Sequence, residues 1–464
     1  MATNNDDTTV VVGGDAAGLS AASKLKRDAP EQEVIVFERG EWVSYGACGL
    51  PYYVKGDIDR LDDLVVNDAE TFREERDIDL RTGHEVVEID VDERTVVVEA
   101  DDGKFEQSYD NLVIATGARA LVPPIDGADL DGLFTLQTMD AGGDIRKAVE
   151  HGIEGADEVI EPERVGIVGG GYVGVELAEA FHERGLEVHL FEMLPHVLNP
   201  FGESTARVVE EHLREHDVDL SLGTRVEAFN GEHGRVRSIE TPEETVPVDL
   251  AILGVGVEPR VELAEQAGIE TGPTGAIATD QYGETNVQDV YAAGDCAEAT
   301  HTVTGAPDYV PLALTANRHG RAVGATIAGD PTPTGPIAGT AALKAFDLEA
   351  ARTGIVDPER AEDVGFDPVS KTLELPSRAH YYPGSEEITV TLVADETTGR
   401  VLGASMVGRE GVAQRINSVA TALHTGVTVD ELERFDFAYA PPFSPTWDPV
   451  LTAAKVLNGT IDSR

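Results

Sequence analysis

Two glycine-rich turns, each between a run of β-branched residues and a segment with helical character, constrain the fold of this chain more than any other feature. The first, residues 13–18, reads Gly-Gly-Asp-Ala-Ala-Gly, and the second, residues 169–174, reads Gly-Gly-Gly-Tyr-Val-Gly. A strand, a glycine turn and a helix in this order are typical of Rossmann-like units, in which backbone N–H groups at a helix N-terminus approach a pyrophosphate. Two such units predict an α/β protein with two dinucleotide-binding sites.

The first turn departs from the G-x-G-x-x-G pattern because Asp15 occupies the second glycine position. A side chain there would crowd the pyrophosphate if the backbone followed its usual path, so a plain βαβ turn remains an alternative for this copy alone. The next apolar run, 33–37, ends at an acidic residue about 20 positions beyond the turn, where a carboxylate accepts hydrogen bonds from a ribose. The residues predicted to bind this nucleotide are Gly13, Gly14, Ala16, Ala17, Gly18 and Glu38.

The second turn keeps all three glycines of the pattern, at Gly169, Gly171 and Gly174. The strand-like run after it ends at Glu192. A carboxylate at this position favours the free 2′-hydroxyl of NADH and repels the 2′-phosphate of NADPH. The second site is therefore predicted to bind NADH in preference to NADPH.

The stretch 44–53 contains Cys48, one of only two cysteines in 464 residues. Enzymes that relay electrons through an internal dithiol carry two cysteines a few residues apart, so a solitary sulfur cycles through a mixed disulfide, a persulfide or a sulfenic acid. The second cysteine, Cys296, is expected to serve core packing. No disulfide framework and no metal site are predicted.

The chain carries 86 acidic and 35 basic residues, a formal net charge of −51, spread along its whole length. Nucleic acid is therefore excluded as a partner, and the charge is typical of a protein from a salt-rich cytoplasm, because self-repulsion is screened at molar salt. Residues 1–7 lack the basic and apolar parts of a signal peptide, and no apolar run approaches the length of a membrane span. The protein is expected to be cytoplasmic and not membrane-bound.

Several further segments match one family: 110–118, 290–295, 311–321, 381–384 and 439–445. With the two turns and the Cys48 stretch, they make the chain resemble the single-cysteine branch of the FAD-dependent pyridine nucleotide-disulfide oxidoreductases, the coenzyme A disulfide reductases and their NADH oxidase relatives. The resemblance implies FAD and NADH as cofactors, with NADPH possible, and a homodimer. It also implies a discontinuous FAD domain (1–117 and 256–335), an NAD(P)H domain (118–255) and a C-terminal α+β dimerisation domain (336–464).

The same resemblance assigns roles to individual residues. Further contacts to the two cofactors are implied for Arg39, Ser44, Thr116, Gly117, Tyr172, Gly294 and Asp295. The implied catalytic residues are Cys48, Glu176, Tyr381 and Tyr439, the tyrosines reaching the partner subunit's site, with Tyr382 as an alternative to Tyr381. Cys48 is implied to open a helix, whose N-terminus lowers the pKa of the thiol.

A basic group on the first helix, Lys24, Lys26 and Arg27, is predicted to bind coenzyme A phosphates together with Ser44, Asn317 and Arg321. The favoured activity is NADH-dependent reduction of coenzyme A disulfide or a related small disulfide. An NADH oxidase is an alternative, but the family's peroxide-handling histidine is replaced by Ala16. A polysulfide or persulfide reductase, which is disfavoured because no rhodanese-like segment precedes Arg464, and a flavin-containing redox sensor also stay open.

Overall fold

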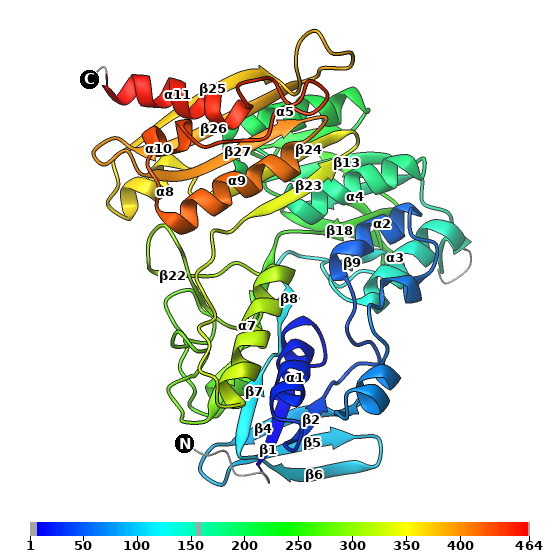
Figure 1. The fold of residues 1–464 in the computed structure, drawn as a ribbon. Coiled ribbons are helices and arrows are strands. Elements are labelled where there is room, and N and C mark those ends of the chain that lie inside the picture. Colours follow the sequence, from blue (N-terminus) through cyan, green and yellow to red (C-terminus); the bar gives the residue numbers. More distant parts are fainter. Residues whose placement is uncertain (1–6, 155–158, 463–464) are drawn as a thin grey trace.

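The computed structural model describes residues 7–154 and 159–462, so most of the amino-terminal segment considered above, residues 1–6, lies outside it. Three five-stranded sheets organise the chain (Figure 1). The first is parallel, in the order β20-β7-β1-β2-β3. Its strands are β1 (Thr8–Val12), β2 (Glu33–Phe37), β3 (Asp79–Arg81), β7 (Asn111–Ile114) and β20 (Val290–Ala292). This sheet therefore combines two stretches of chain that are far apart in sequence.

The second sheet repeats the parallel arrangement in the order β14-β13-β12-β18-β9. Its strands are β9 (Leu133–Thr135), β12 (Arg164–Val168), β13 (Glu187–Glu192), β14 (Asp219–Leu222) and β18 (Leu250–Leu253). The associated helices are α3 (Met139–His151), α4 (Tyr172–Glu183) and α5 (Glu203–Glu215). Each parallel sheet is accompanied by a three-stranded antiparallel sheet. Between β3 and β7 of the first sheet, the chain forms β4 (Glu85–Asp90), β5 (Thr95–Ala100) and β6 (Gly103–Ser108). Between β14 and β18 of the second sheet, it forms β15 (Ala228–Glu232), β16 (Arg235–Glu240) and β17 (Thr245–Pro247).

The two connections between the parallel sheets run side by side. β8 (Ala118–Ala120) pairs antiparallel with β19 (Val257–Pro259), and Thr116 Oγ1 donates a hydrogen bond to the carbonyl of Arg260 over 2.8 Å. Residues 110–118 and 249–256 therefore lead into the two connections between the sheets.

The C-terminal sheet is antiparallel, in the order β23-β24-β27-β26-β25. Its elements are β23 (Ala341–Ala345), β24 (Leu348–Gly354), α8 (Pro358–Asp363), β25 (Pro368–Pro376), β26 (Glu387–Asp395), β27 (Val401–Gly408), α9 (Val412–Thr425), α10 (Val429–Glu433) and α11 (Pro449–Asp462). In Figure 1 it lies at the opposite end of the molecule from α1 (Ala16–Asp28). The predicted α+β module is present, and the mixed fold of two Rossmann-like units plus this module is confirmed.

Close packing of α1 on α7 (Ala313–Ile327) brings together residues from distant parts of the sequence. A Cβ atom on Gly320 would lie 2.0 Å from the carbonyl oxygen of Ala17, and one on Gly324 would lie 2.3 Å from that of Ala21. These contacts require glycine, since only a residue without a Cβ admits the neighbouring backbone. Further along the interface, Ser20 Oγ donates to Asn317 Oδ1 over 2.8 Å.

No helix within residues 7–154 and 159–462 is long and apolar enough to cross a membrane.

Candidate active site

The first glycine turn is shaped by backbone contacts that exclude other residues. Gly13 has φ +111°, and a Cβ atom on it would lie 2.2 Å from the carbonyl oxygen of Ala115. A Cβ atom on Gly18 would lie 1.9 Å from the carbonyl oxygen of Gly13. Glu38 holds the turn from the end of β2, because its carboxylate accepts from Gly14 N (2.7 Å) and Gly40 N (2.8 Å). The turn therefore has the tight geometry that a dinucleotide pyrophosphate needs.

Asp15, the departure from the glycine pattern, points its carboxylate toward the Cys48 stretch. One oxygen accepts from the backbone N–H of Tyr45 over 3.2 Å, and burial raises the pKa of Asp15 to about 6. The neighbouring Ala16 and Ala17 begin α1. The aspartate thus links the first turn to the segment that carries the thiol, and the side chain has a partner other than the pyrophosphate.

Asp295 supplies the strongest evidence that these residues fit FAD. Its carboxylate lies at the end of β20, its Oδ1 is buried with no hydrogen-bond partner among the described residues, and burial raises its pKa to about 6. A buried acceptor without a donor is costly unless a ligand satisfies it, and the ribityl hydroxyls of a flavin are suitable donors. Gly294 is needed beside it, since a Cβ atom there would lie 2.7 Å from the Cβ of Ala17. Gly117 also adopts a positive φ, +68°, after the β7 strand.

The second glycine turn repeats the first with more open space. A Cβ atom on Gly169 would lie 2.4 Å from the carbonyl oxygen of Gly254, and one on Gly174 would lie 1.9 Å from that of Gly169. Gly171 faces open space, with nothing within 4 Å of such an atom. Glu192, nearly buried, accepts from Gly170 N (2.7 Å) and Leu194 N (2.8 Å), as Glu38 does in the first turn. The residues therefore fit a second dinucleotide.

The carboxylate of Glu192 should make NADH the better donor. Replacing Glu192 by Gln removes the repulsion of a 2′-phosphate, so the ratio of kcat/KM for NADH to that for NADPH should fall by about 10- to 30-fold, on the order of 2 kcal/mol. The ratio is measured on one preparation, so that general damage to the turn cancels. A parent enzyme that prefers NADPH at both low and molar salt would contradict the assignment.

Cys48 lies in a short 3-10 turn, Ala47–Gly49, immediately before α2 (Leu50–Lys55), and its side chain is accessible. Partial burial, followed by the negative charges of Glu176 and Asp295, raises the pKa of the thiol. The expectation that a helix N-terminus lowers the pKa of this thiol is wrong. The helix α2 is short and begins two residues later, and burial together with the acidic neighbours outweighs its effect.

Glu176, on α4, faces the thiol segment, which is the stretch 44–53 that contains Cys48. Tyr52 on α2 donates to Glu176 Oε1 over 3.0 Å, and burial raises the pKa of this carboxyl group to about 7. One turn earlier, Tyr172 packs edge-on against Phe201, and its hydroxyl accepts from Arg352 Nε over 3.0 Å. An acidic group whose pKa lies near neutrality, beside a cysteine and two nucleotide turns, is typical of a redox or proton-transfer site.

A cleft of about 390 Å³ opens between α1, α7 and the start of the thiol segment. Five of the six residues predicted to bind substrate line it: Lys24, Arg27, Ser44, Asn317 and Arg321. Lys26 does not, because its ammonium is held by Asp77 (2.7 Å) and the carbonyl of Pro30 (2.8 Å). Including Lys26 in the basic group was therefore wrong.

Arg76 also lines the cleft, although the sequence did not single it out. Its guanidinium donates to Ser23 Oγ (3.0 Å) and Asn67 Oδ1 (3.1 Å) and lies over the ring of Phe72, 4.5 Å from the centroid. These partners are neutral, so the positive charge remains available to an anion. Residues 73–76 read as a mixed charge run typical of a solvated face, and no local pattern distinguishes Arg76.

The three candidate tyrosines lie in the C-terminal module. The hydroxyls of Tyr381 and Tyr439 are 2.8 Å apart, and the side chains are 63% and 45% exposed. Tyr382 lies instead beside Arg378, whose guanidinium is 5.8 Å from the ring centroid. Of the two neighbouring tyrosines, Tyr381 is therefore the one paired with Tyr439.

Cys296 is fully buried among apolar side chains, and its thiol donates weakly to the carbonyls of Ile114 (3.4 Å) and Ala293 (3.5 Å). Cys48 and Cys296 are both free thiols. The prediction that Cys296 serves packing is confirmed.

Family models and relatives agree with this geometry. The model of the pyridine nucleotide-disulphide oxidoreductases matches residues 7–320, and that of their dimerisation domain matches residues 340–449. The fold and the site thus define an FAD- and NAD(P)H-dependent oxidoreductase. The chain belongs to the pyridine nucleotide-disulphide oxidoreductase family.

Similar proteins carry several different names. An NAD(P)H coenzyme A polysulfide/persulfide reductase of Pyrococcus horikoshii is 39% identical (98% of this chain, 100% of that one). A coenzyme A disulfide reductase of Staphylococcus aureus is 31% identical (94% and 96%). The solved structure of an NAD-dependent persulfide reductase from A. fulgidus superimposes with a TM-score of 0.94 at 38% identity (98% and 84%).

Proposed function

We propose that this protein uses NAD(P)H to reduce coenzyme A disulfide, or a related low-molecular-weight disulfide, through Cys48. The observation that carries the proposal is the basic cleft, because Ser44 and Tyr45 belong both to its wall and to the segment that presents the thiol. A phosphate-bearing substrate held in the cleft therefore has a short path to Cys48.

The cleft concentrates positive charge in a chain that is otherwise strongly negative. Lys24, Arg27, Arg76 and Arg321 line it, although the chain has 35 basic residues against 86 acidic ones. Lys24 is paired with Asp28, while Arg76 contacts neutral groups. Guanidinium groups bind phosphates through charge-assisted hydrogen bonds. Coenzyme A disulfide, which carries phosphates, therefore suits the cleft better than a disulfide without charged groups.

Bound FAD carries two electrons from NAD(P)H to the sulfur at Cys48. The Cys48 thiolate attacks one sulfur of the disulfide, forming a mixed disulfide and releasing the first thiolate. Two electrons then cleave the mixed disulfide, restoring the Cys48 thiolate and releasing the second thiolate. In balance, one NAD(P)H and one proton convert one disulfide into two thiols.

The raised pKa of the Cys48 thiol makes proton control part of this chemistry. Glu176, whose pKa is about 7, holds or releases a proton near neutral pH and receives a hydrogen bond from Tyr52. Loss of the Glu176 proton adds a negative charge near the sulfur, so a neutral Glu176 favours the thiolate.

The proposal includes a homodimer in which each Cys48 meets Tyr381 and Tyr439 of the partner subunit. The tyrosine pair is exposed on loops of the C-terminal module, and the sheet of that module lies at the opposite end of the protomer from α1, the helix that carries Lys24 and Arg27 (Figure 1). A two-fold arrangement brings one protomer's pair to its partner's cleft, where a phenol can hydrogen-bond the leaving thiolate.

Reduction of a polysulfide or persulfide is the second candidate, favoured by the names of the Pyrococcus and A. fulgidus proteins. An NADH oxidase is less well supported. A Methanocaldococcus jannaschii relative, 33% identical (96% of this chain, 97% of that one), bears that name, but Ala16 cannot take part in peroxide chemistry.

Anaerobic NADH oxidation in molar KCl tests the proposal. Coenzyme A disulfide, its analogue without the 3′-phosphate, cystine and polysulfide are compared, with an air-saturated blank without disulfide. Coenzyme A disulfide should give the highest kcat/KM. Fastest turnover with polysulfide would establish the second candidate, and oxygen consumption exceeding all disulfide rates would establish the oxidase.

Replacing Arg27 by Gln should separate phosphate binding from chemistry. Loss of a charge-assisted hydrogen bond to phosphate, worth about 1.5–3 kcal/mol, should raise the KM for coenzyme A disulfide by about 10-fold or more and leave kcat unchanged. Arg207→Gln, an exposed arginine on α5, is the matched control. Equal KM values for Arg27→Gln and the parent would contradict phosphate binding in this cleft.

A further inference from the structure

The two tyrosines that meet at their hydroxyls lie on irregular segments. Tyr381 belongs to residues 377–386, between β25 and β26, and Tyr439 belongs to residues 434–448, between α10 and α11. Neither segment contains a helix or a strand. A segment of this kind holds a side chain in place only where tertiary contacts fix it. One backbone bond joins the two segments directly, from Ala379 N to the carbonyl of Pro441 (3.2 Å).

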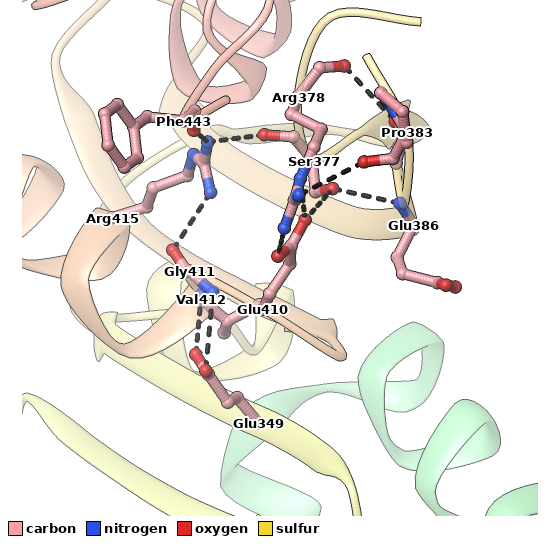
Figure 2. Close-up of polar contacts among 11 residues, drawn as sticks. Glu349, Ser377, Arg378, Pro383, Glu386, Glu410, Gly411, Val412, Arg415 and Phe443 are labelled. Carbon is pink, nitrogen blue, oxygen red and sulfur yellow. Dashed lines mark hydrogen bonds and ion pairs between the residues drawn. The ribbon is translucent and has the colours of Figure 1, made fainter. Parts of the chain in front are cut away.

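A single guanidinium joins the same two segments more firmly. Arg415 Nη2, on α9, donates to the carbonyls of Ser377 and Phe443, each over 2.8 Å (Figure 2). The Arg415 side chain is only 12% exposed, and its Nε donates to Asp448 over 2.9 Å. Asp448 in turn accepts from Ser444 Oγ over 3.0 Å. The planar fork of arginine suits this geometry, since it directs several donors at once.

The start of α9 is itself anchored. Glu349, on β24, accepts from the backbone N–H groups of Val412 (2.7 Å) and Ala413 (2.9 Å), as Figure 2 shows for the first of these. Just before the helix, Glu410 is paired with Arg378 and accepts from Ser377 Oγ over 2.5 Å. The tyrosine segment 377–386 is thus held by Arg415 on α9 and by Glu410 just before that helix, while the segment 434–448 reaches the helix through Arg415.

We propose that Arg415 is a positioning residue for the Tyr381–Tyr439 pair, and that its bridge between the carbonyls of Ser377 and Phe443 sets the two segments so that both phenols act together. The inference deepens the proposed function and rests on it, because the pair serves disulfide reduction at the partner's Cys48. Arg415 itself touches neither substrate nor cofactor. It acts by fixing where the tyrosine hydroxyls lie.

The test compares Arg415→Gln and Arg415→Lys with Arg400→Gln. Arg400 is a partly buried arginine of the same module that donates to the carbonyl of Thr302 (3.2 Å) and lies over the ring of Phe366 (5.9 Å to the centroid), and both of these partners are outside the tyrosine segments. Each variant is assayed for anaerobic turnover of coenzyme A disulfide and for NADH-dependent reduction of ferricyanide, which needs the cofactor sites but no tyrosine. Each is also combined with Tyr439→Phe.

Arg415→Gln should lower kcat for the disulfide by about 10- to 100-fold, the cost of a small misplacement, and leave ferricyanide reduction unchanged. Arg415→Lys should rescue little, because an ammonium lacks the fork. The double variant with Tyr439→Phe should be no slower than the slower single variant, since both changes remove one function. Three results would each overturn the inference: a double variant slowed by the product of the two single effects, a parallel loss of ferricyanide reduction, or full rescue by Arg415→Lys.

A pH titration of tyrosinate absorbance at 295 nm tests the bridge without any substrate. The curve of Tyr439→Phe is subtracted from the parent curve, and the difference reports the ionisation of Tyr439. The hydrogen bond from Tyr381 lowers the pKa of Tyr439, so Arg415→Gln should shift this pKa upward. If Tyr439→Phe alone leaves disulfide turnover at the parent rate, the role proposed for the tyrosines fails. The titration then decides the inference: an upward shift sustains the bridge, and no shift overturns it.

Discussion

Cys48→Ser is expected to lose at least about 1,000-fold in disulfide turnover while FAD remains bound, because a serine hydroxyl neither attacks a disulfide nor forms a mixed one. Neither glycine turn depends on the sulfur: the first is held by Glu38 and the second by Glu192. NADH-dependent ferricyanide reduction should therefore persist. The measurements are the flavin absorbance per protein and the anaerobic rates with the two acceptors.

The matched control is Cys296→Ser, which changes the other sulfur of the chain. Cys296 is fully buried and donates only weakly to two carbonyls, so disulfide turnover should stay near the parent value. Loss of turnover in Cys296→Ser with retention in Cys48→Ser would reverse the assignment of the redox thiol. Loss in both variants would require a mechanism with two sulfurs.

Much of the fold was predictable because local rules and tertiary structure agree. Gly13, Gly169 and Gly174 stand where any Cβ atom would collide with a backbone carbonyl oxygen, so the sequence has no freedom at these positions. Glu38 and Glu192 follow at the ends of the next strands. The exact domain boundaries stay a prediction, although β20 does join β7 and β1 from a distant part of the chain.

Residues brought together by packing were predictable only where the family resemblance supplied them. Asn317 reaches the cleft because Gly320 and Gly324 let α7 approach α1, which no local pattern reveals. Arg76 comes from a mixed charge run, and Arg415 resembles any helical arginine until its two carbonyl partners are known.

The direction of the Cys48 pKa was misjudged for a related reason. The family resemblance implied a helix N-terminus at Cys48, but it revealed neither the burial of the thiol, nor the charges of Glu176 and Asp295 beside it, nor the short length of α2. The sign of a pKa shift depends on the sum of burial, charges and hydrogen bonds in three dimensions. The resemblance therefore supplied the helix after Cys48 but not the sign of the pKa shift of its thiol.

The three parts of the protomer meet at one buried carboxylate, Glu179 on α4. It is 3% exposed and accepts from Lys55 Nζ (2.8 Å) at the end of α2, from Lys344 Nζ (2.7 Å) on β23, and from the backbone N–H of Phe346 (2.7 Å). Lys55 also ends the helix that follows the Cys48 turn. This junction therefore fixes the thiol segment relative to Glu176, one turn earlier on α4.

Glu179→Gln should lower the free energy of unfolding by about 3 kcal/mol, because removing the carboxylate from a buried ionic group takes away the ion pair of Lys344 and leaves Lys55 with the half-exposed Asp57 alone (3.1 Å). Since Lys344 is 46% exposed, water compensates part of its loss, and the expected effect lies at the lower end for buried pairs. Glu183→Gln, an exposed change of the same kind on the same helix, is the control and should melt with the parent. Thermal unfolding of the holoenzyme at fixed salt measures both variants. Coinciding melting curves for Glu179→Gln and Glu183→Gln would mean that the lysines find other partners, and that the junction does not hold the three parts together.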